Sequence, residues 1–171
     1  QIFNQYPILL KASYVMLKYS FPDLTASAFG DTGRPRQSME CLESAILMAD
    51  RYQLPILPDL LNAAMIMEQA GQYDRSKSGL TGLLCYLPEL PKVKSVNDHL
   101  WNRSEQLDFA SCYLQRNGID PQNGLMCVVQ GATYNHNHSN GMSMELYGAG
   151  TVQGIDPGNG PTYEHPMHVN Y

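Results

Sequence analysis

The chain has 171 residues, of which 43% are hydrophobic and 16% are charged, and its formal net charge is −5. These values predict a globular protein with a hydrophobic core and exclude an intrinsically disordered acidic tail. No apolar run approaches the roughly 20 residues of a spanning helix, so we expect no membrane insertion, and the acidic balance argues against nucleic-acid binding. The cysteines are too widely spaced for a zinc ribbon or a CxxC redox site. We expect them to be free thiols in the core, and the alternative of one disulfide bond stays open if the chain is exported.

The charge distribution divides the chain into two parts. All 11 lysines and arginines lie at or before Arg116. Residues 117–171 contain no cation but hold four acidic residues, nine of the 14 glycines and four of the five histidines. Such a shift indicates a boundary between two kinds of structure. We assign residues 1–100 to a helical part and residues 101–171 to a strand-rich part.

The first part has the periodicity of helices. Apolar residues recur at helical spacing over residues 8–19, 39–49 and 58–71, and a shorter helix is expected over residues 82–86. Ser38 is a suitable N-cap, Pro58 suits a first turn, and Gly71 suits a helix end. The methionine-rich stretch Met65–Met67 is expected to fill the core.

The second part has the pattern of short strands. Four segments of this kind, at residues 109–115, 125–130, 142–147 and 151–155, are separated by glycine-rich turns. Asn-Gly pairs at residues 117–118, 123–124 and 140–141 are strong turn signals. Helices followed by antiparallel strands predict an α+β fold with segregated layers and not βαβ units.

The two ends of the chain suggest a fragment of a larger protein. Gln1 begins directly in a helical pattern, and Tyr171 ends the chain where a four-stranded sheet would still have an open edge. We therefore expect these residues to belong to a longer parent protein.

Polar residues are densest over residues 134–141, which read Tyr-Asn-His-Asn-His-Ser-Asn-Gly. In an extended backbone His136 and His138 point to the same side, because strand side chains alternate. Two imidazoles and a carboxylate can bind a divalent metal, and Asp156 follows at about the distance of a strand, a turn and a return strand. Solvated histidines beside a turn are the alternative.

Three segments in this region form a longer pattern: Asn135–His138, Ser143–Gly148 and Gly154–Gly158. An H-x-H motif is followed by a strand that ends near a glycine and by a strand that ends in an aspartate-containing turn. Together with Phe21–Asp23 and Phe29–Thr32, this pattern resembles the heparinase II/III-like family of polysaccharide lyases. The resemblance implies the C-terminal part of an (α/α) toroid followed by the first strands of an antiparallel β-sandwich.

The resemblance also implies roles for individual residues. His136 matches a catalytic histidine of the substrate cleft, and Asn135 matches a group that helps to neutralise the substrate carboxylate. His138 and Asp156 match ligands of a divalent metal, zinc or calcium, whose role would be mainly structural.

Two tyrosines are candidates for the catalytic acid. Tyr163 lies in a turn rich in glycine and proline, whereas Tyr147 lies in a strand pattern and is expected to be in the core. The chain departs from the family pattern at Asn140, where many members have an aspartate, and this difference removes a charge. The family's upstream helices with further catalytic residues are not among these 171 residues.

The implied activity is cleavage of a uronic-acid polysaccharide, such as a glycosaminoglycan, by β-elimination. The implied partners are this acidic polysaccharide and the remainder of the parent protein, and the implied location is the bacterial periplasm or the outside of the cell. Two other classes stay open. They are a cupin-like metal-dependent hydrolase or oxygenase built on the histidine pair, and a non-catalytic glycan-binding or structural module.

Overall fold

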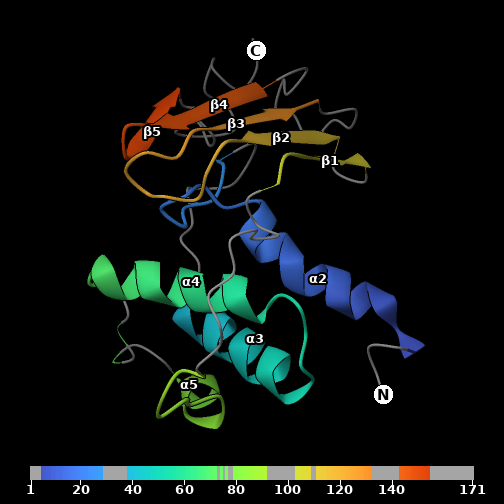
Figure 1. Cartoon of the computed structure of the whole chain (residues 1–171), viewed down its shortest axis with the longest axis vertical. Helices are drawn as coiled ribbons and strands as arrows, with labels where there is room; N and C mark the ends of the chain where they lie inside the picture. Colours follow the sequence, from blue (N-terminus) through green and yellow to red (C-terminus); the bar gives the residue numbers. More distant parts are fainter. Residues whose placement is uncertain are drawn as a thin grey trace, which may run out of the picture. The chain divides into compact units, whose positions relative to one another are not determined.

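The computed structural model describes residues 5–28, 38–72, 74, 76, 79–91, 103–108, 111–131 and 143–154. Helices precede strands in these ranges, which is the order that the sequence patterns predicted (Figure 1). The chain divides into a helical unit, Gln1–Lys18 with Gln37–Trp101, and a strand unit, Tyr19–Arg36 with Asn102–Tyr171. No helix in the ranges given above is long and apolar enough to cross a membrane.

The helical unit contains α2 (Pro7–Lys18), α3 (Met39–Arg51), α4 (Leu57–Gln69) and α5 (Leu80–Leu84). The N-cap of α3 is as predicted, because the Ser38 hydroxyl accepts a hydrogen bond from the Cys41 amide at 3.2 Å. Pro58 lies in the first turn of α4, and Gly71 follows the helix with a φ of 65°. Helix α3 packs against α4. Its buried apolar residues recur at the helical spacing predicted over residues 39–49, and they are Leu42, Ile46 and Ala49.

Some apolar side chains that were expected in the core lie at the surface. In α4, Ile66 and Met67 are buried but Met65 is half-exposed. All four cysteines are free thiols, and Cys112 is buried whereas Cys41 is exposed. Periodicity identifies a helix, but it does not identify which apolar positions the rest of the fold covers.

The strand unit contains an antiparallel five-stranded sheet in the order β1-β2-β3-β4-β5. Its strands are β1 (Glu105–Leu107), β2 (Cys112–Arg116), β3 (Met126–Gln130), β4 (Ser143–Gly148) and β5 (Thr151–Gly154). Each pairs with the next along the chain, as in a meander. The last four correspond to the predicted strands, whereas β1 was not predicted, because three residues are too few to show an alternating pattern.

Alternation along the strands gives the sheet two different faces. One face is buried, and its central row consists of Leu114, Val128 and Glu145. The other face is more exposed, and its neighbouring row consists of Gln115, Cys127 and Leu146. A hydrophobic cluster covers the buried face. It comprises Phe21, Leu107, Cys112, Leu114, Met126, Val128 and Tyr147.

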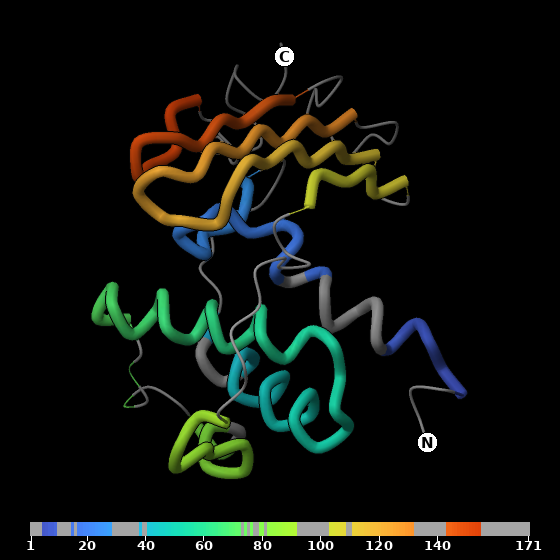
Figure 2. The backbone as a smooth tube through the Cα atoms, in the orientation of Figure 1, coloured from blue at the N-terminus to red at the C-terminus, as the bar shows by residue number. Residues whose placement is uncertain are grey.

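Residues 19–28 pack on the buried face of the sheet and appear as a blue loop against it (Figure 2). The Phe21 ring is fully buried and stacks on Tyr147, with a centroid distance of 5.6 Å and an interplanar angle of 17°. The Asp23 carboxylate accepts hydrogen bonds from the Thr25 amide at 3.0 Å and the Thr25 hydroxyl at 2.6 Å. This segment lies within residues 1–100, which we assigned to the helical part, yet it groups with the strands.

The connection between β2 and β3 contains both Asn-Gly pairs that precede residue 125, and it is a long loop instead of a tight turn. The Asn117 side chain accepts a hydrogen bond from the Leu125 amide at 2.8 Å. The Asp120 carboxylate accepts hydrogen bonds from the Asn123 and Gln122 amides, each at 2.8 Å, and these bonds lower the pKa of that carboxyl. The asparagine and aspartate side chains therefore order this loop.

The β4–β5 hairpin turns at Ala149 and Gly150, whose φ angles are 50° and 79°. Two-residue hairpin turns with positive φ at both positions favour Asn-Gly, and alanine is strained there. We expect Ala149→Asn to raise the free energy of unfolding by about 0.5–1 kcal/mol, measured by urea denaturation. Ala149→Val is the matched control and should lower it. Equal stability of all three proteins would show that the turn is not strained.

Candidate active site

All five site residues predicted from the sequence lie outside the described part of the chain. They are Asn135, His136, His138, Asp156 and Tyr163. The structure does describe the strands that flank them. Strand β4 begins five residues after His138, and β5 ends two residues before Asp156. In this antiparallel hairpin Leu146 is opposite Gly154, so the start of β4 and the end of β5 lie toward the same end of the sheet. Both predicted metal ligands are therefore close in sequence to that end.

A hydrogen bond within the strand unit joins β4 to the end of the segment that covers the sheet. The Ala28 amide donates a hydrogen bond of 3.1 Å to Oε2 of Glu145, and the two residues are 117 positions apart in the chain. Ala28 directly precedes the motif Phe29–Thr32, and Glu145 lies in the motif Ser143–Gly148. Glu145 was not predicted as a site residue. The sequence signal that could have identified Glu145 as a buried residue is the alternation along β4, which places it on the same face as Tyr147.

Arg116 forms a second link between the sheet and the covering segment. Its side chain is buried, and its Nη2 donates to the backbone oxygen of Ser20 at 3.4 Å. Its Nη1 donates to the backbone oxygen of Arg103 at 3.4 Å, and its Nε donates to the sulfur of Met126 at 3.3 Å. Burial lowers the pKa of this guanidinium to about 10, while the charge of Glu105 opposes that shift. Arg116 is thus a buried cation with structural partners, and sequence reasoning missed this role.

Tyr147 is a core residue, as its strand pattern predicted. Its hydroxyl donates a hydrogen bond of 2.7 Å to the backbone oxygen of Pro121. Burial, and then the charges of Asp23 and Asp120, raise the pKa of Tyr147 to about 12. A phenol with this pKa stays protonated at neutral pH, and its proton is already donated to Pro121. These properties argue against Tyr147 as the catalytic acid.

The raised pKa of Tyr147 predicts a loss of stability at alkaline pH. Because the pKa is about 12 in the folded state and 10.0 for a solvated tyrosine, the neutral phenol stabilises the fold fully below pH 10 and this contribution is lost toward pH 12. We expect urea denaturation at several pH values to show a steeper decline for the natural protein than for Tyr147→Phe. At neutral pH the variant should be less stable by about 1 kcal/mol, since it lacks the hydrogen bond. Parallel pH curves would contradict the prediction.

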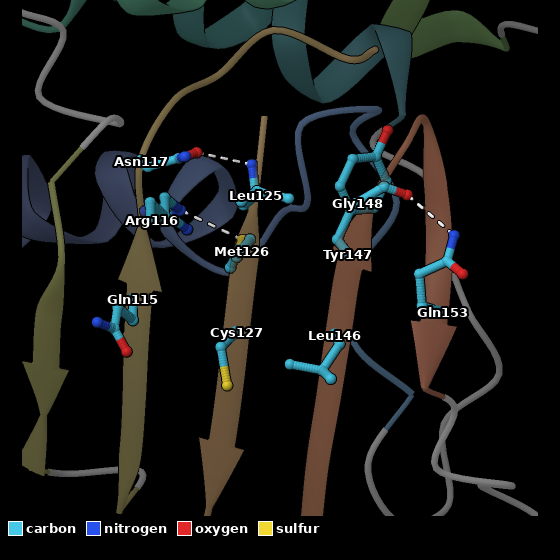
Figure 3. Close-up of a pocket in the computed structure, with 10 residues that line it drawn as sticks. All are labelled: Gln115, Arg116, Asn117, Leu125, Met126, Cys127, Leu146, Tyr147, Gly148 and Gln153. Atoms are coloured by element: carbon cyan, nitrogen blue, oxygen red, sulfur yellow. Dashed lines mark hydrogen bonds between the residues drawn. The ribbon is translucent and has the colours of Figure 1, made fainter. Parts of the chain in front are cut away.

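An open pocket of about 470 Å³ lies over β2, β3, β4 and β5 (Figure 3). Gln115, Cys127 and Leu146 line it from neighbouring strands, beside the side chain of Gln153. Its described lining includes no acidic residue and no histidine. Burial raises the pKa of the Cys127 thiol, so this cysteine is a poor nucleophile at neutral pH. Tyr147 and Arg116 also line the pocket, but both have structural hydrogen-bond partners, so none of its described lining residues is suited to acid–base or nucleophilic catalysis.

The same face of the sheet exposes large apolar side chains. Tyr113, Met144 and Leu146 alternate with buried residues along β2 and β4 and are between 40% and 55% exposed. Apolar patches of this kind on a sheet commonly mark a surface that packs against another layer.

Among the residues that the structure describes, no group of three acidic, histidine or cysteine side chains could hold a metal ion.

Comparison with known proteins relates the chain to a polysaccharide lyase. It is 27% identical over 186 residues to an endo-acting ulvan lyase from Formosa agariphila. The match covers the whole of this chain and 23% of the relative, so the chain spans less than a quarter of that enzyme's length. No family model and no solved structure matches the chain. The chain is therefore similar, along its entire length, to one part of a polysaccharide lyase.

Proposed function

We propose that the chain is part of a lyase that cleaves a uronic-acid polysaccharide by β-elimination. The observation that carries this proposal is the similarity to an ulvan lyase over the whole chain. The aligned region spans the helical unit, the sheet and the segment in which the histidine motif was predicted. The stacking of Phe21 on Tyr147 supports it further, because it joins a residue of the motif Phe21–Asp23 to a residue of the motif Ser143–Gly148.

The proposed reaction removes the proton at C5 of a uronic acid and expels the oxygen at C4, so that a C4–C5 double bond forms. The C5 proton is weakly acidic, and a base must approach it to within about 3 Å. His136 is the proposed base, and Asn135 would donate a hydrogen bond to the neighbouring carboxylate and stabilise the charge that develops there. Tyr163 is the proposed acid that protonates the leaving oxygen.

His138 and Asp156 are the proposed ligands of a divalent metal. Imidazole nitrogen with carboxylate oxygen is a donor set of zinc sites, whereas calcium prefers oxygen ligands, so zinc is the better fit. A bound zinc ion would supply structural cross-linking near the end of the β4–β5 hairpin. The ion would take no part in the proton transfers, which are assigned to His136 and Tyr163.

Replacing His138 by alanine is therefore expected to release the metal and to lower the melting temperature of the parent protein, since metal binding stabilises the folded state. Elemental analysis and thermal melts measure the two effects. If His138 is a solvated surface residue, the variant should instead differ from the natural protein by at most about 0.5 kcal/mol. Retention of metal and stability would contradict the assignment.

The proposed lyase has an acidic polysaccharide as its substrate and acts in the periplasm or outside the bacterial cell. The name of the relative makes ulvan the first substrate to test. We further propose that the helical unit belongs to an (α/α) toroid. The exposed apolar face of the sheet would then pack against a second sheet of the parent protein, as in a β-sandwich.

The proposal is tested by incubating the parent protein with ulvan and, separately, with a glycosaminoglycan. Ultraviolet absorbance of the unsaturated uronate reports elimination, and a reducing-end assay reports every chain cleavage. New reducing ends without a double bond would indicate a hydrolase, and binding without cleavage would indicate a glycan-binding module. The isolated 171 residues serve as a comparison and should be inactive, because the proposed cleft needs further residues in near-attack geometry.

A further inference from the structure

Glu145 is an unusual residue for its place in the fold. It is fully buried in the middle of β4, and its neighbours across the sheet are apolar. Val128 is directly opposite it on β3, and Leu114 follows on β2. Burying a carboxylate costs free energy unless hydrogen bonds satisfy it, and an apolar residue of similar volume often stabilises such a position equally well. An apolar residue could fill this place in the sheet, so the hydrogen bonding of the carboxylate is what distinguishes a glutamate here.

The Glu145 carboxylate fixes one point of the segment that covers the sheet. Its Oε2 accepts the hydrogen bond from the Ala28 amide at 3.1 Å. Hydrogen bonds to a charged acceptor are about twice as strong as neutral ones, and a buried amide without an acceptor is costly. At the other end of the segment Phe21 stacks on Tyr147. The segment is thus held by aromatic stacking near its start and by a carboxylate at Ala28.

We propose that Glu145 is a positioning residue for the elimination reaction, an inference that rests on the proposed function. Ala28 leads directly into Phe29–Thr32, and Glu145 follows His138 by seven residues. The hydrogen bond fixes the backbone at Ala28 against the strand that follows the histidine motif. Displacement of catalytic groups by about 1 Å can cost about 10²-fold in rate, so such a connection affects turnover without contacting the substrate.

Glu145→Leu and Glu145→Gln in the parent protein test this role. Leucine fills the apolar row but removes the acceptor, whereas glutamine keeps an acceptor oxygen without the charge. We expect Glu145→Leu to lower kcat on ulvan by about 10- to 100-fold with KM unchanged, and to accelerate hydrogen exchange at the Ala28 amide. Glu145→Gln should restore most of both properties. Met144→Leu is the matched control, since it keeps an apolar side chain of similar volume on the opposite face of the same strand, and it should change neither.

The hydrogen-exchange measurement separates failure of this inference from failure of the proposed function. If the natural protein forms no unsaturated product from any uronic-acid polysaccharide, the proposed function fails and the positioning role fails with it, whatever the exchange shows. If the natural protein is active, an unchanged Ala28 exchange rate in Glu145→Leu overturns the inference. Fast hydrogen exchange at the Ala28 amide of the natural protein would also overturn the inference, and this measurement requires no variant. A fall in kcat that merely follows the unfolded fraction, measured by thermal melts, also overturns it.

Discussion

Replacing His136 by alanine in the parent protein should lower kcat by about 10²–10⁴-fold, the usual cost of losing one acid–base group. The proposed base acts only on the C5 proton, so its loss should raise the barrier of the chemical step and leave folding and metal content nearly unchanged. Steady-state kinetics on ulvan, with thermal melts and elemental analysis of the same samples, measure all three properties.

The His138→Ala variant is the internal control for this prediction. It removes the same side chain two residues away but should act through metal loss and lower stability. If His136→Ala loses metal and stability while His138→Ala retains them, the two assignments are reversed. If both variants keep full activity, neither histidine belongs to the active site, and the alternative of two solvated histidines beside a turn is correct.

Replacing Phe21 by alanine is expected to lower the free energy of unfolding of this chain by about 3–5 kcal/mol, the range for deletion of a buried phenylalanine ring. The ring is fully buried, and it stacks on Tyr147 within the hydrophobic cluster of the sheet. The variant loses both the buried apolar area and the stacking. Chemical denaturation followed by circular dichroism measures the change.

Met144→Ala provides the control for the Phe21 variant. Its side chain is 55% exposed on the opposite face of the sheet, so its truncation should cost much less. Phe21→Leu should recover part of the loss, because leucine refills some of the cavity. Equal effects of Phe21→Ala and Met144→Ala would show that residues 19–28 do not form part of the cooperative core.

The elements with local signals could be predicted from the sequence. Ser38, Pro58 and Gly71 mark helix ends because each satisfies a requirement of the nearby backbone, and all three positions are as expected. Alternation likewise identified the strands and placed Tyr147 in the core. These signals depend on neighbours within a few residues, which a single sequence contains.

The tertiary contacts could not be predicted in the same way. The grouping of residues 19–28 with the sheet depends on partners about a hundred positions away, such as Ala28 with Glu145. Arg116 and Glu145 lie on the buried face of the sheet, whereas their charges alone favour exposed positions. For the candidate site, the sequence indicates the kind of chemistry that His136 and His138 suit, while the proximity of functional groups is a property of the whole fold.

The separation of Ala28 from its partner has a consequence for synthesis of the protein in the cell. The 117 positions between Ala28 and Glu145 take about 6–23 s to translate at roughly 5–20 residues per second. The hairpin of α3 and α4 forms through contacts that are close in sequence, so it can fold during this interval. Residues 19–28, in contrast, can pack on the sheet only after β4 has emerged from the ribosome. Until then the apolar residues of this segment are available to chaperones, and slow completion of the sheet should make the nascent chain depend on them.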